Sequence, residues 1–297
     1  MHIFVTGATG FIGSAVAQEL LAAGYRVSGL ARSGKAAESL RAAGVGVFLG
    51  HLGDPASLRA GIASADGIIH TAFNHDFSKI KESCEQDRCS IETFVNALAG
   101  SSIPLIVTSA TGAIQAKGLL DEDAKPTPAS GAPPRAVAEE IVAAAVARGV
   151  NASIVRLPPS VHGNGDHAFI PMLIDMARRT GVSAYVGEGQ NCWSAVHRLD
   201  AAVLYRLVLE KGSKGGVYHG VAEEGIAFRE IAGVIGRRLN VPVVSKTPQD
   251  AAEHFGWFSH FAQRDMPASS RKTQKDLGWM PKEVGLIADI DRPEYFL

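Results

Sequence analysis

The residues that most clearly point to chemistry are three glycines close to the amino terminus. They belong to the segment Gly7-Ala8-Thr9-Gly10-Phe11-Ile12-Gly13, which directly follows the apolar run Ile3-Phe4-Val5. A strand that ends in such glycines and passes at once into a helix offers backbone N–H groups and the positive helix end to a dinucleotide pyrophosphate. A second strand pattern at 27–31 makes the match more specific. We therefore predict a dinucleotide site formed by Gly7, Thr9, Gly10, Phe11, Ile12 and Gly13.

Alternating strand and helix patterns in the first half of the chain would position this loop. Strands are expected at 3–5, 27–31, 45–49, 67–72, 105–109 and 153–156, and helices at 11–23, 35–43, 55–63, 78–98 and 133–148. Such alternation predicts a parallel sheet with helices on both faces. The predicted fold class is α/β, a Rossmann-type doubly wound parallel sheet covering residues 1–160.

The alternation breaks after Pro158. Helices are expected at 169–179, 200–209 and 228–239, with a short strand at 184–186 and a last short helix before Gly278. Loops rich in glycine, histidine and proline surround the first of these helices. We interpret residues 161–297 as a smaller substrate-binding lobe that closes over the cofactor, with residues 194–210 returning to the larger domain.

The composition is that of an ordinary globular protein. The 297 residues are 46% hydrophobic and carry a net charge of -1, which gives no electrostatic reason to expect nucleic acid or an acidic membrane as a partner. No apolar run reaches the ~18 residues of a membrane span, and nothing resembles a metal site. The three cysteines, Cys84, Cys89 and Cys192, are expected to be reduced thiols. With a first strand at residue 3 and no room for a leader, we expect a cytoplasmic protein.

Further motifs extend over nearly the whole chain. They are His70-Thr71-Ala72, Val107-Thr108-Ser109, Arg156-Leu157-Pro158-Pro159-Ser160-Val161-His162-Gly163, Val196-His197-Arg198-Leu199-Asp200-Ala201-Ala202 and Leu277-Gly278-Trp279-Met280-Pro281. With the glycine segment, they resemble the extended and atypical short-chain dehydrogenase/reductases, the NAD(P)-dependent epimerase/dehydratase family. The resemblance implies the Rossmann fold and a nicotinamide cofactor, and it leaves the substrate open.

The choice of cofactor depends on the end of the second strand. Relatives that use NAD have a carboxylate there, which binds the adenosine ribose; here the place falls on Ala31, and Arg32 and Ser33 follow. A guanidinium can bind a 2′-phosphate bidentately, so we predict NADP(H) as the preferred cofactor and NAD(H) as the alternative. The resemblance implies further cofactor contacts at His51, Leu52, Thr71, Ala72, Phe73, Arg135 and Pro158.

The catalytic set of this family is incomplete in the sequence. The resemblance assigns the serine after the fifth strand to Ser109, with Thr111 as a second choice. The usual Tyr-x-x-x-Lys is not found, because the alignment puts Gly131 at the tyrosine and Arg135 at the lysine. Arginine can hold ribose hydroxyls but does not lose its proton. Asp87 replaces the usual Asn; it can order a water or bind a polar substrate, or equally pair with the adjacent arginine at a helix surface.

Another group must supply the proton that the tyrosine would give. His162 stands where relatives have a tyrosine near the nicotinamide, and histidine titrates near neutrality. The predicted catalytic residues are therefore Ser109, Arg135, His162 and Asp87, with an ordered water as the alternative proton source. His167 and His197 are further candidates, and each of these histidines can instead be structural. The resemblance places Tyr185, Asn191 and Trp193 where relatives meet the substrate, so they are predicted substrate contacts; the two aromatic residues can equally belong to the core.

These residues predict an NADP(H)-dependent oxidoreductase that reduces a carbonyl, or oxidises the alcohol, on a small metabolite. A sugar-type epimerase or dehydratase is the alternative enzyme. A non-catalytic NADP-binding sensor with the same fold is the alternative of another class, since the dyad is broken. Relatives often dimerise through the helices that match 78–98 and 133–148, so a homodimer is an open prediction.

Overall fold

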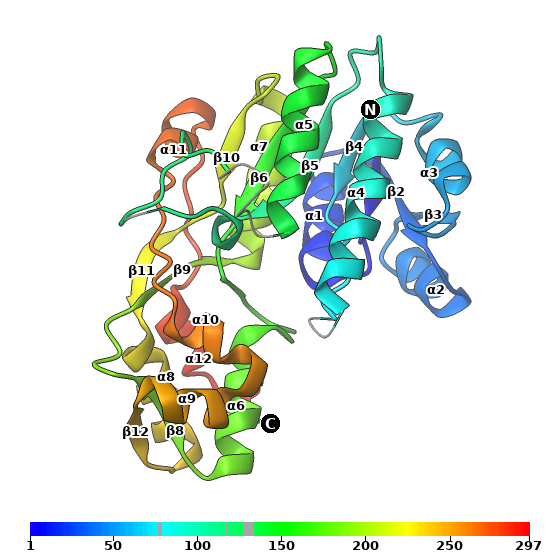
Figure 1. Ribbon diagram of the computed structural model, residues 1–297. Coiled ribbons are helices and arrows are strands. Elements are labelled where there is room, and N and C mark those ends of the chain that lie inside the picture. Colours follow the sequence, from blue (N-terminus) through cyan, green and yellow to red (C-terminus); the bar gives the residue numbers. More distant parts are fainter. Residues whose placement is uncertain (77–78, 117, 127–133) are drawn as a thin grey trace.

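A parallel sheet of seven strands forms the larger lobe of this computed structural model, which describes residues 1–76, 79–116, 118–126 and 134–297 (Figure 1). The strand order is β10-β6-β5-β4-β1-β2-β3, and every neighbouring pair is parallel. The strands are β1 His2–Thr6, β2 Arg26–Ala31, β3 Gly46–Leu49, β4 Gly67–His70, β5 Leu105–Ala110, β6 Ala152–Leu157 and β10 Val217–His219.

Helices cover both faces of this sheet. One apolar layer joins the sheet to α1 Phe11–Ala22, α2 Gly34–Ala42 and α7 Arg198–Lys211. The other layer joins it to α3 Pro55–Ile62, α4 Ile80–Ala97 and α5 Val137–Ala147. Local sequence explains the boundaries: the Asp54 side chain accepts a hydrogen bond from the Ala56 N–H and caps α3, with a proline at its first position. The predicted doubly wound α/β fold is confirmed.

The smaller lobe lies below the sheet in Figure 1 and has its own apolar core. It contains a three-stranded sheet of β7 Ser160–His162, β9 Cys192–His197 and β11 Glu223–Ala227, and a two-stranded sheet of β8 Ser183–Val186 and β12 Val243–Lys246. Its helices are α6 Phe169–Thr180, α8 Phe228–Leu239, α9 Pro248–Phe255, α10 Ser259–Gln263 and α12 Leu286–Ile290.

The chain crosses between the two lobes more than once. Within the expected returning segment 194–210, α7 packs on α1, whereas β9 belongs to the three-stranded sheet of the smaller lobe. Two later segments also join the larger lobe: β10 pairs with β6, and α11 Arg271–Leu277 leads to Trp279, which is fully buried in the same core as α1. The lobes are therefore not two continuous stretches of chain.

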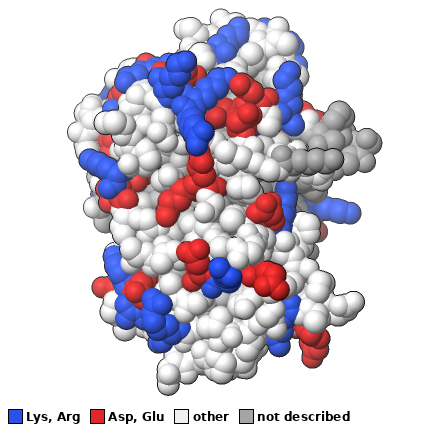
Figure 2. Space-filling model, turned by 90° about the vertical axis from the view of Figure 1, so that its left-hand side faces the viewer, with Lys and Arg blue, Asp and Glu red and all other residues white. Residues whose placement is uncertain are grey.

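Surface charge and helix composition indicate which kinds of partner the molecule could bind. On the face shown in Figure 2, basic and acidic side chains are intermixed over both lobes. Within the part of the chain that the structure describes, no helix combines the length and the apolar character needed to cross a bilayer.

Candidate functional site

The glycine loop joins the end of β1 to the start of α1. Gly7 has a φ of +75°, and its carbonyl accepts a hydrogen bond from the Gly10 N–H at 2.8 Å. A Cβ on Gly13 would lie 2.1 Å from the Gly7 carbonyl oxygen, so only glycine allows α1 to approach the loop this closely. Gly10 precedes α1 without a side-chain cap, which leaves N–H groups of the first turn available to a ligand. Thr9 and Gly10 are exposed.

The segment after β4 lies directly against this loop. A Cβ on Gly7 would be 2.8 Å from both the Ala72 nitrogen and Thr71 Oγ1. The next residue, Phe73, has the guanidinium carbon of Arg135 3.5 Å from the centre of its ring. Three of the predicted cofactor contacts and Arg135 are therefore brought together beside the glycine loop.

A buried row of polar side chains holds Arg135 in this position. Arg135 Nη1 lies 3.5 Å from Asp87 Oδ2, and Asp87 Oδ1 lies 3.1 Å from His70 Nε2. On the far side of its ring, His70 Nδ1 is 2.6 Å from Thr6 Oγ1. The alternative surface pairing of Asp87 does not occur, because Arg88 pairs instead with Glu85 and Glu92 on the outside of α4.

The adenosine end of the predicted site lies after β2. Ala31 is buried at the end of the strand, and Arg32 and Ser33 are exposed beyond it. The Ser33 hydroxyl accepts a hydrogen bond from the Ala36 N–H at 3.2 Å and caps α2, whose first turn has no acidic residue. Nearby, His51 Nδ1 accepts a hydrogen bond from the Gly53 N–H at 2.9 Å. The structure therefore gives this end a cation and a helix N-terminus, without a carboxylate after β2.

Ser109 is engaged in a buried network and not open to a ligand, which differs from our prediction. Its side chain is buried, and its hydroxyl donates to Glu139 Oε1 at 2.6 Å. Glu139 pairs in turn with Arg156 at 2.7 Å, and Arg156 Nη1 lies 3.2 Å from His219 Nε2. Successive residues of a strand point to opposite faces, and the face of Ser109 is the one that carries this buried network.

Thr111 is better placed than Ser109 to reach a ligand. It follows β5, lies in the turn that packs against the turn containing Arg135, and is buried. Among the described residues, its hydroxyl has no hydrogen-bond partner. Arg264, from the smaller lobe, donates to the carbonyls of Gly112 at 2.6 Å and Ile114 at 3.2 Å and so fixes this turn. Burial lowers the pKa of Arg264.

His162 is buried in a contact with the carboxyl-terminal segment, which differs from our prediction. It lies on β7, is fully buried, and its Nδ1 is 2.9 Å from Asp289 Oδ2 in α12. Asp289 also accepts from the Tyr295 hydroxyl at 3.0 Å, so the pair joins β7 to the carboxyl-terminal segment. A ring enclosed in this way cannot protonate a substrate in the conformation seen here, because the smaller lobe covers it.

The three predicted substrate contacts have mainly structural roles. Trp193 is fully buried and packs against Phe228 in the core of the smaller lobe, so it does not reach a substrate. Asn191 donates to the carbonyls of Ala262 at 3.0 Å and Arg264 at 3.3 Å, which positions the segment carrying Arg264. Tyr185 is half-buried on β8 and packs at the edge of the same core.

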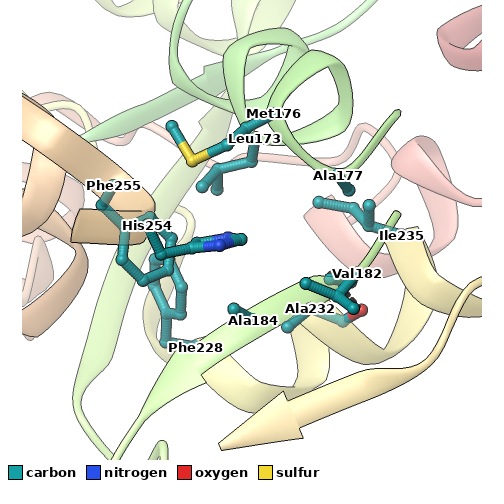
Figure 3. A pocket seen from close by; sticks show the side chains of 11 residues that line it. Leu173, Met176, Ala177, Val182, Ala184, Phe228, Ala232, Ile235, His254 and Phe255 are labelled. Atoms are coloured by element: carbon teal, nitrogen blue, oxygen red, sulfur yellow. Dashed lines mark hydrogen bonds between the residues drawn. The ribbon is translucent and has the colours of Figure 1, made fainter. Parts of the chain in front are cut away.

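Figure 3 shows a cavity in this core, with the side chain of His254 directed into it between Leu173 and Phe228. Its volume of about 10 Å³ is close to the space that a single water needs. It cannot hold a metabolite, and it is enclosed by the elements of the smaller lobe.

The remaining predicted residues are placed as follows. Leu52 is half-buried and its carbonyl accepts a hydrogen bond from the Ser90 hydroxyl, while Pro158 is buried between β6 and β7. His167 lies beside Phe11, with 5.8 Å between the ring centres, and His197 caps α7. Gly131 lies outside the described residues. Among the residues described, no group of three or more histidine, cysteine or acidic side chains could hold a metal ion.

These residues fit a nicotinamide dinucleotide. The uncapped first turn of α1 suits the pyrophosphate, and the segment from Thr71 to Phe73 lies beside it. The two contacts of Arg135 to Asp87 and the Thr108 carbonyl leave other N–H donors of its guanidinium for ribose hydroxyls.

Comparisons with known proteins show the family to which the chain belongs. The profile of the NAD dependent epimerase/dehydratase family matches residues 3–219. An uncharacterised protein of Schizosaccharomyces pombe is 50% identical over 296 residues, which are 100% of each chain. A 4-hydroxy-2-methyl-3-oxo-4-farnesyl-3,4-dihydroquinoline-1-oxide ketoreductase of Stigmatella aurantiaca is 32% identical over 228 residues, covering 73% of this chain and 67% of that protein.

A solved structure of a dTDP-glucose 4,6-dehydratase from Streptomyces venezuelae, with NAD bound, has the same fold. It superposes with a TM-score of 0.79 at 20% identity, and the match covers 100% of this chain and 97% of that one. The family profile spans the glycine loop and every strand of the larger sheet. The chain therefore belongs to the NAD-dependent epimerase/dehydratase family.

Proposed function

We propose that this protein is an NADP(H)-dependent oxidoreductase that reduces a carbonyl group on a small metabolite, or oxidises the corresponding alcohol. The observation that carries the proposal is the series of contacts from the glycine loop through Phe73 to Arg135. The adjoining turn adds the Thr111 hydroxyl, which has no hydrogen-bond partner among the described residues. This arrangement offers N–H groups for a pyrophosphate, a ribose anchor and a hydrogen-bond donor in one place. The similarity to a ketoreductase supports carbonyl reduction over a sugar reaction.

The preference for NADP(H) is inferred from the residues after β2. Arg32 is exposed beside the N-terminus of α2, and Ala31 provides no carboxylate for the ribose hydroxyls. A 2′-phosphate would gain a charge-assisted hydrogen bond from the guanidinium as well as the field of the helix end. NAD(H) lacks this phosphate and would gain neither.

The protein side chains would act mainly by orientation. When bound, the reduced cofactor supplies the hydride that adds to the carbonyl carbon. Arg135 would hold the ribose next to the nicotinamide and so orient the reacting ring. Thr111 would donate its hydroxyl hydrogen to the carbonyl oxygen as negative charge develops there. Water would supply the proton that completes the alcohol, because Arg135 stays cationic.

A comparison of Thr111→Val with Ser109→Ala tests this assignment. We expect Thr111→Val to lower turnover by at least about 100-fold with unchanged NADPH affinity, since it removes only the hydroxyl that would contact the carbonyl oxygen. Ser109→Ala should lower the thermal midpoint without a comparable loss of turnover, because its partner Glu139 is in the buried network. The measurement is NADPH consumption with a panel of ketones and aldehydes. Equal turnover of Thr111→Val and the parent would contradict the role of Thr111.

A non-catalytic NADP-binding protein is the alternative to an enzyme, and it would give a different result in the assay of NADPH consumption. It would bind NADPH and consume none with any carbonyl in the panel. A sugar epimerase or dehydratase would leave the total amount of NADPH unchanged while converting its own substrate, which product analysis would detect.

Location and assembly are further parts of the proposal. The three cysteines are free, which agrees with a reducing cytoplasm. A homodimer through α4 and α5 would use alanine-rich surface on α5, and sedimentation analysis would test it. Dissociation to monomers at micromolar concentration would contradict the dimer.

A further inference from the structure

A second helix begins beside the glycine loop. Arg198, the first residue of α7, has its guanidinium carbon 4.9 Å from the ring centre of Phe11, the first residue of α1. Further along the same helices, Arg206 Nε lies 2.7 Å from Glu19 Oε1. The two contacts are equally spaced along both helices, so α1 and α7 run parallel and their N-termini lie side by side.

Arg198 carries a positive charge that no acidic group compensates. Among the described residues it makes no ion pair, and its one hydrogen bond is from Nη1 to the carbonyl of Asn164 at 2.8 Å. Its Nε is buried, and no described residue hydrogen-bonds to it. Burial lowers the pKa of this guanidinium. A partly desolvated cation without an anion is costly, and the cost falls when an anion binds.

The loop after β7 is shaped around this side chain. Gly163 has a φ of +131°, and a Cβ there would lie 3.0 Å from Arg198 Cγ. The loop carbonyl of Asn164 then holds the guanidinium over Phe11. Asp200, the acidic residue in the first turn of α7, does not oppose the charge directly, because its two oxygens accept from the N–H groups of Lys282 and Glu283 at 3.0 Å.

We propose that Arg198, held over Phe11 at the start of α1, binds the pyrophosphate of the cofactor. The inference rests on the dinucleotide site of the proposed function and adds a residue to it. A diphosphate over the first turn of α1 would meet the uncapped N-terminus of that helix and the guanidinium from the start of α7. This contact is independent of the 2′-phosphate and of the nicotinamide.

ADP-ribose is the probe that tests this contact, because it contains the pyrophosphate and lacks both the 2′-phosphate and the nicotinamide. Its dissociation constant would be measured by calorimetry for the full chain, for the neutral variants Arg198→Gln and Arg198→Met, and for Arg198→Lys. Arg179→Gln is the matched control, since Arg179 is an exposed arginine on α6 with only a surface partner. Thermal midpoints without ligand would show which variants are folded.

We expect the folded neutral variants to bind ADP-ribose, NADPH and NADH about tenfold more weakly or worse, with similar losses for all three ligands. Arg198→Lys should recover part of the affinity, and Arg179→Gln should match the parent. A shallower dependence of affinity on salt in the neutral variants would agree with a lost phosphate contact. An affinity of Arg198→Gln or Arg198→Met for ADP-ribose within twofold of the parent would overturn the inference while leaving the proposed function intact. A parent chain that binds none of the three ligands would overturn both.

Discussion

Arg135 is the residue on which the candidate site depends most. Its guanidinium contacts the Phe73 ring, Asp87 and the Thr108 carbonyl, and it therefore joins three elements at the edge of the sheet. Asp87 is itself buried between Arg135 and His70. Because arginine remains protonated at every accessible pH, it can anchor a ribose but cannot introduce an ionisation into an activity profile.

Arg135→Gln should weaken NADPH and NADH by about tenfold each, since it removes a charged donor from the ribose. It should also lower the free energy of unfolding by roughly 1–3 kcal/mol, because Asp87 loses its cationic partner. Calorimetric titration and chemical denaturation measure the two effects. Arg88→Gln, on the outside of α4, is the control for loss of charge. NADPH affinity equal to that of the parent would show that Arg135 does not touch the cofactor.

The sequence predicts which residue types form the site better than it predicts which way their side chains point. The glycine loop is a local sequence pattern, so the sequence alone predicts its position after the first strand. Thr108 and Ser109 are adjacent on one strand and must face opposite sides, but the sequence does not say which side holds Glu139 and Arg156. The burial of His162 depends on Asp289, which is 127 residues away in the chain. For the same reason the sequence places Thr111 second to Ser109, although the Thr111 hydroxyl is the one without a partner in the described part of the chain.

At the scale of elements, β10 and β6 bring His219 next to Arg156. His219 is buried, its Nδ1 bonds to the Ser269 carbonyl at 2.7 Å, and Nε2 faces the Arg156 guanidinium. Burial, followed by the charge of Arg156, lowers the pKa of His219 to about 4. The folded protein therefore keeps this ring neutral at a pH where the unfolded chain would already be protonated.

This shift makes stability depend on pH. Between pH ~6.5 and ~4 the unfolded state binds the proton that folded His219 excludes, so the free energy of unfolding falls as the pH falls, by up to about 3 kcal/mol. The stability that depends on neutral His219 is fully present above the pKa of the histidine in the unfolded chain, and it is lost as the pH falls. Denaturation of the parent and of His219→Gln at several pH values should show a smaller loss in the variant. Burial raises the pKa of Asp166 to about 6, and this shift makes the folded state more stable as the pH falls. The test therefore compares the pH dependence of the free energy of unfolding between the parent and His219→Gln. Parallel curves would contradict the assignment.

The length of an element determines how well the sequence predicts it. The long helices α1, α4 and α8 have apolar positions at helical spacing, and their bounds match the expected ranges within a few residues. The three-residue strands β7 and β10 have too little sequence for a period and exist because of their partners in the sheets. The predicted helix from 133 begins as α5 at Val137, after a tight turn that carries Arg135.

At the scale of the whole molecule, the smaller lobe stabilises the site without supplying most of it. Arg264 reaches across to the turn that contains Thr111, and Trp279 returns to the core of the larger lobe. The proposed cofactor site consists of elements of the larger lobe, and the inferred contact of Arg198 adds the first residue of α7, which the loop after β7 holds. This division agrees with a family in which one cofactor fold accepts different substrates.

The central proposal is that the site at the glycine loop binds NADP(H) in preference to NAD(H). The most direct measurement is the pair of dissociation constants for NADPH and NADH, determined for the parent chain and for Arg32→Ala. We predict that the parent binds NADPH at least about 30-fold more tightly than NADH, as expected for roughly 2 kcal/mol from a charged contact to the 2′-phosphate. Arg32→Ala should lose most of this difference by weakening NADPH alone. Equal dissociation constants for the two cofactors in the parent chain would contradict the claim.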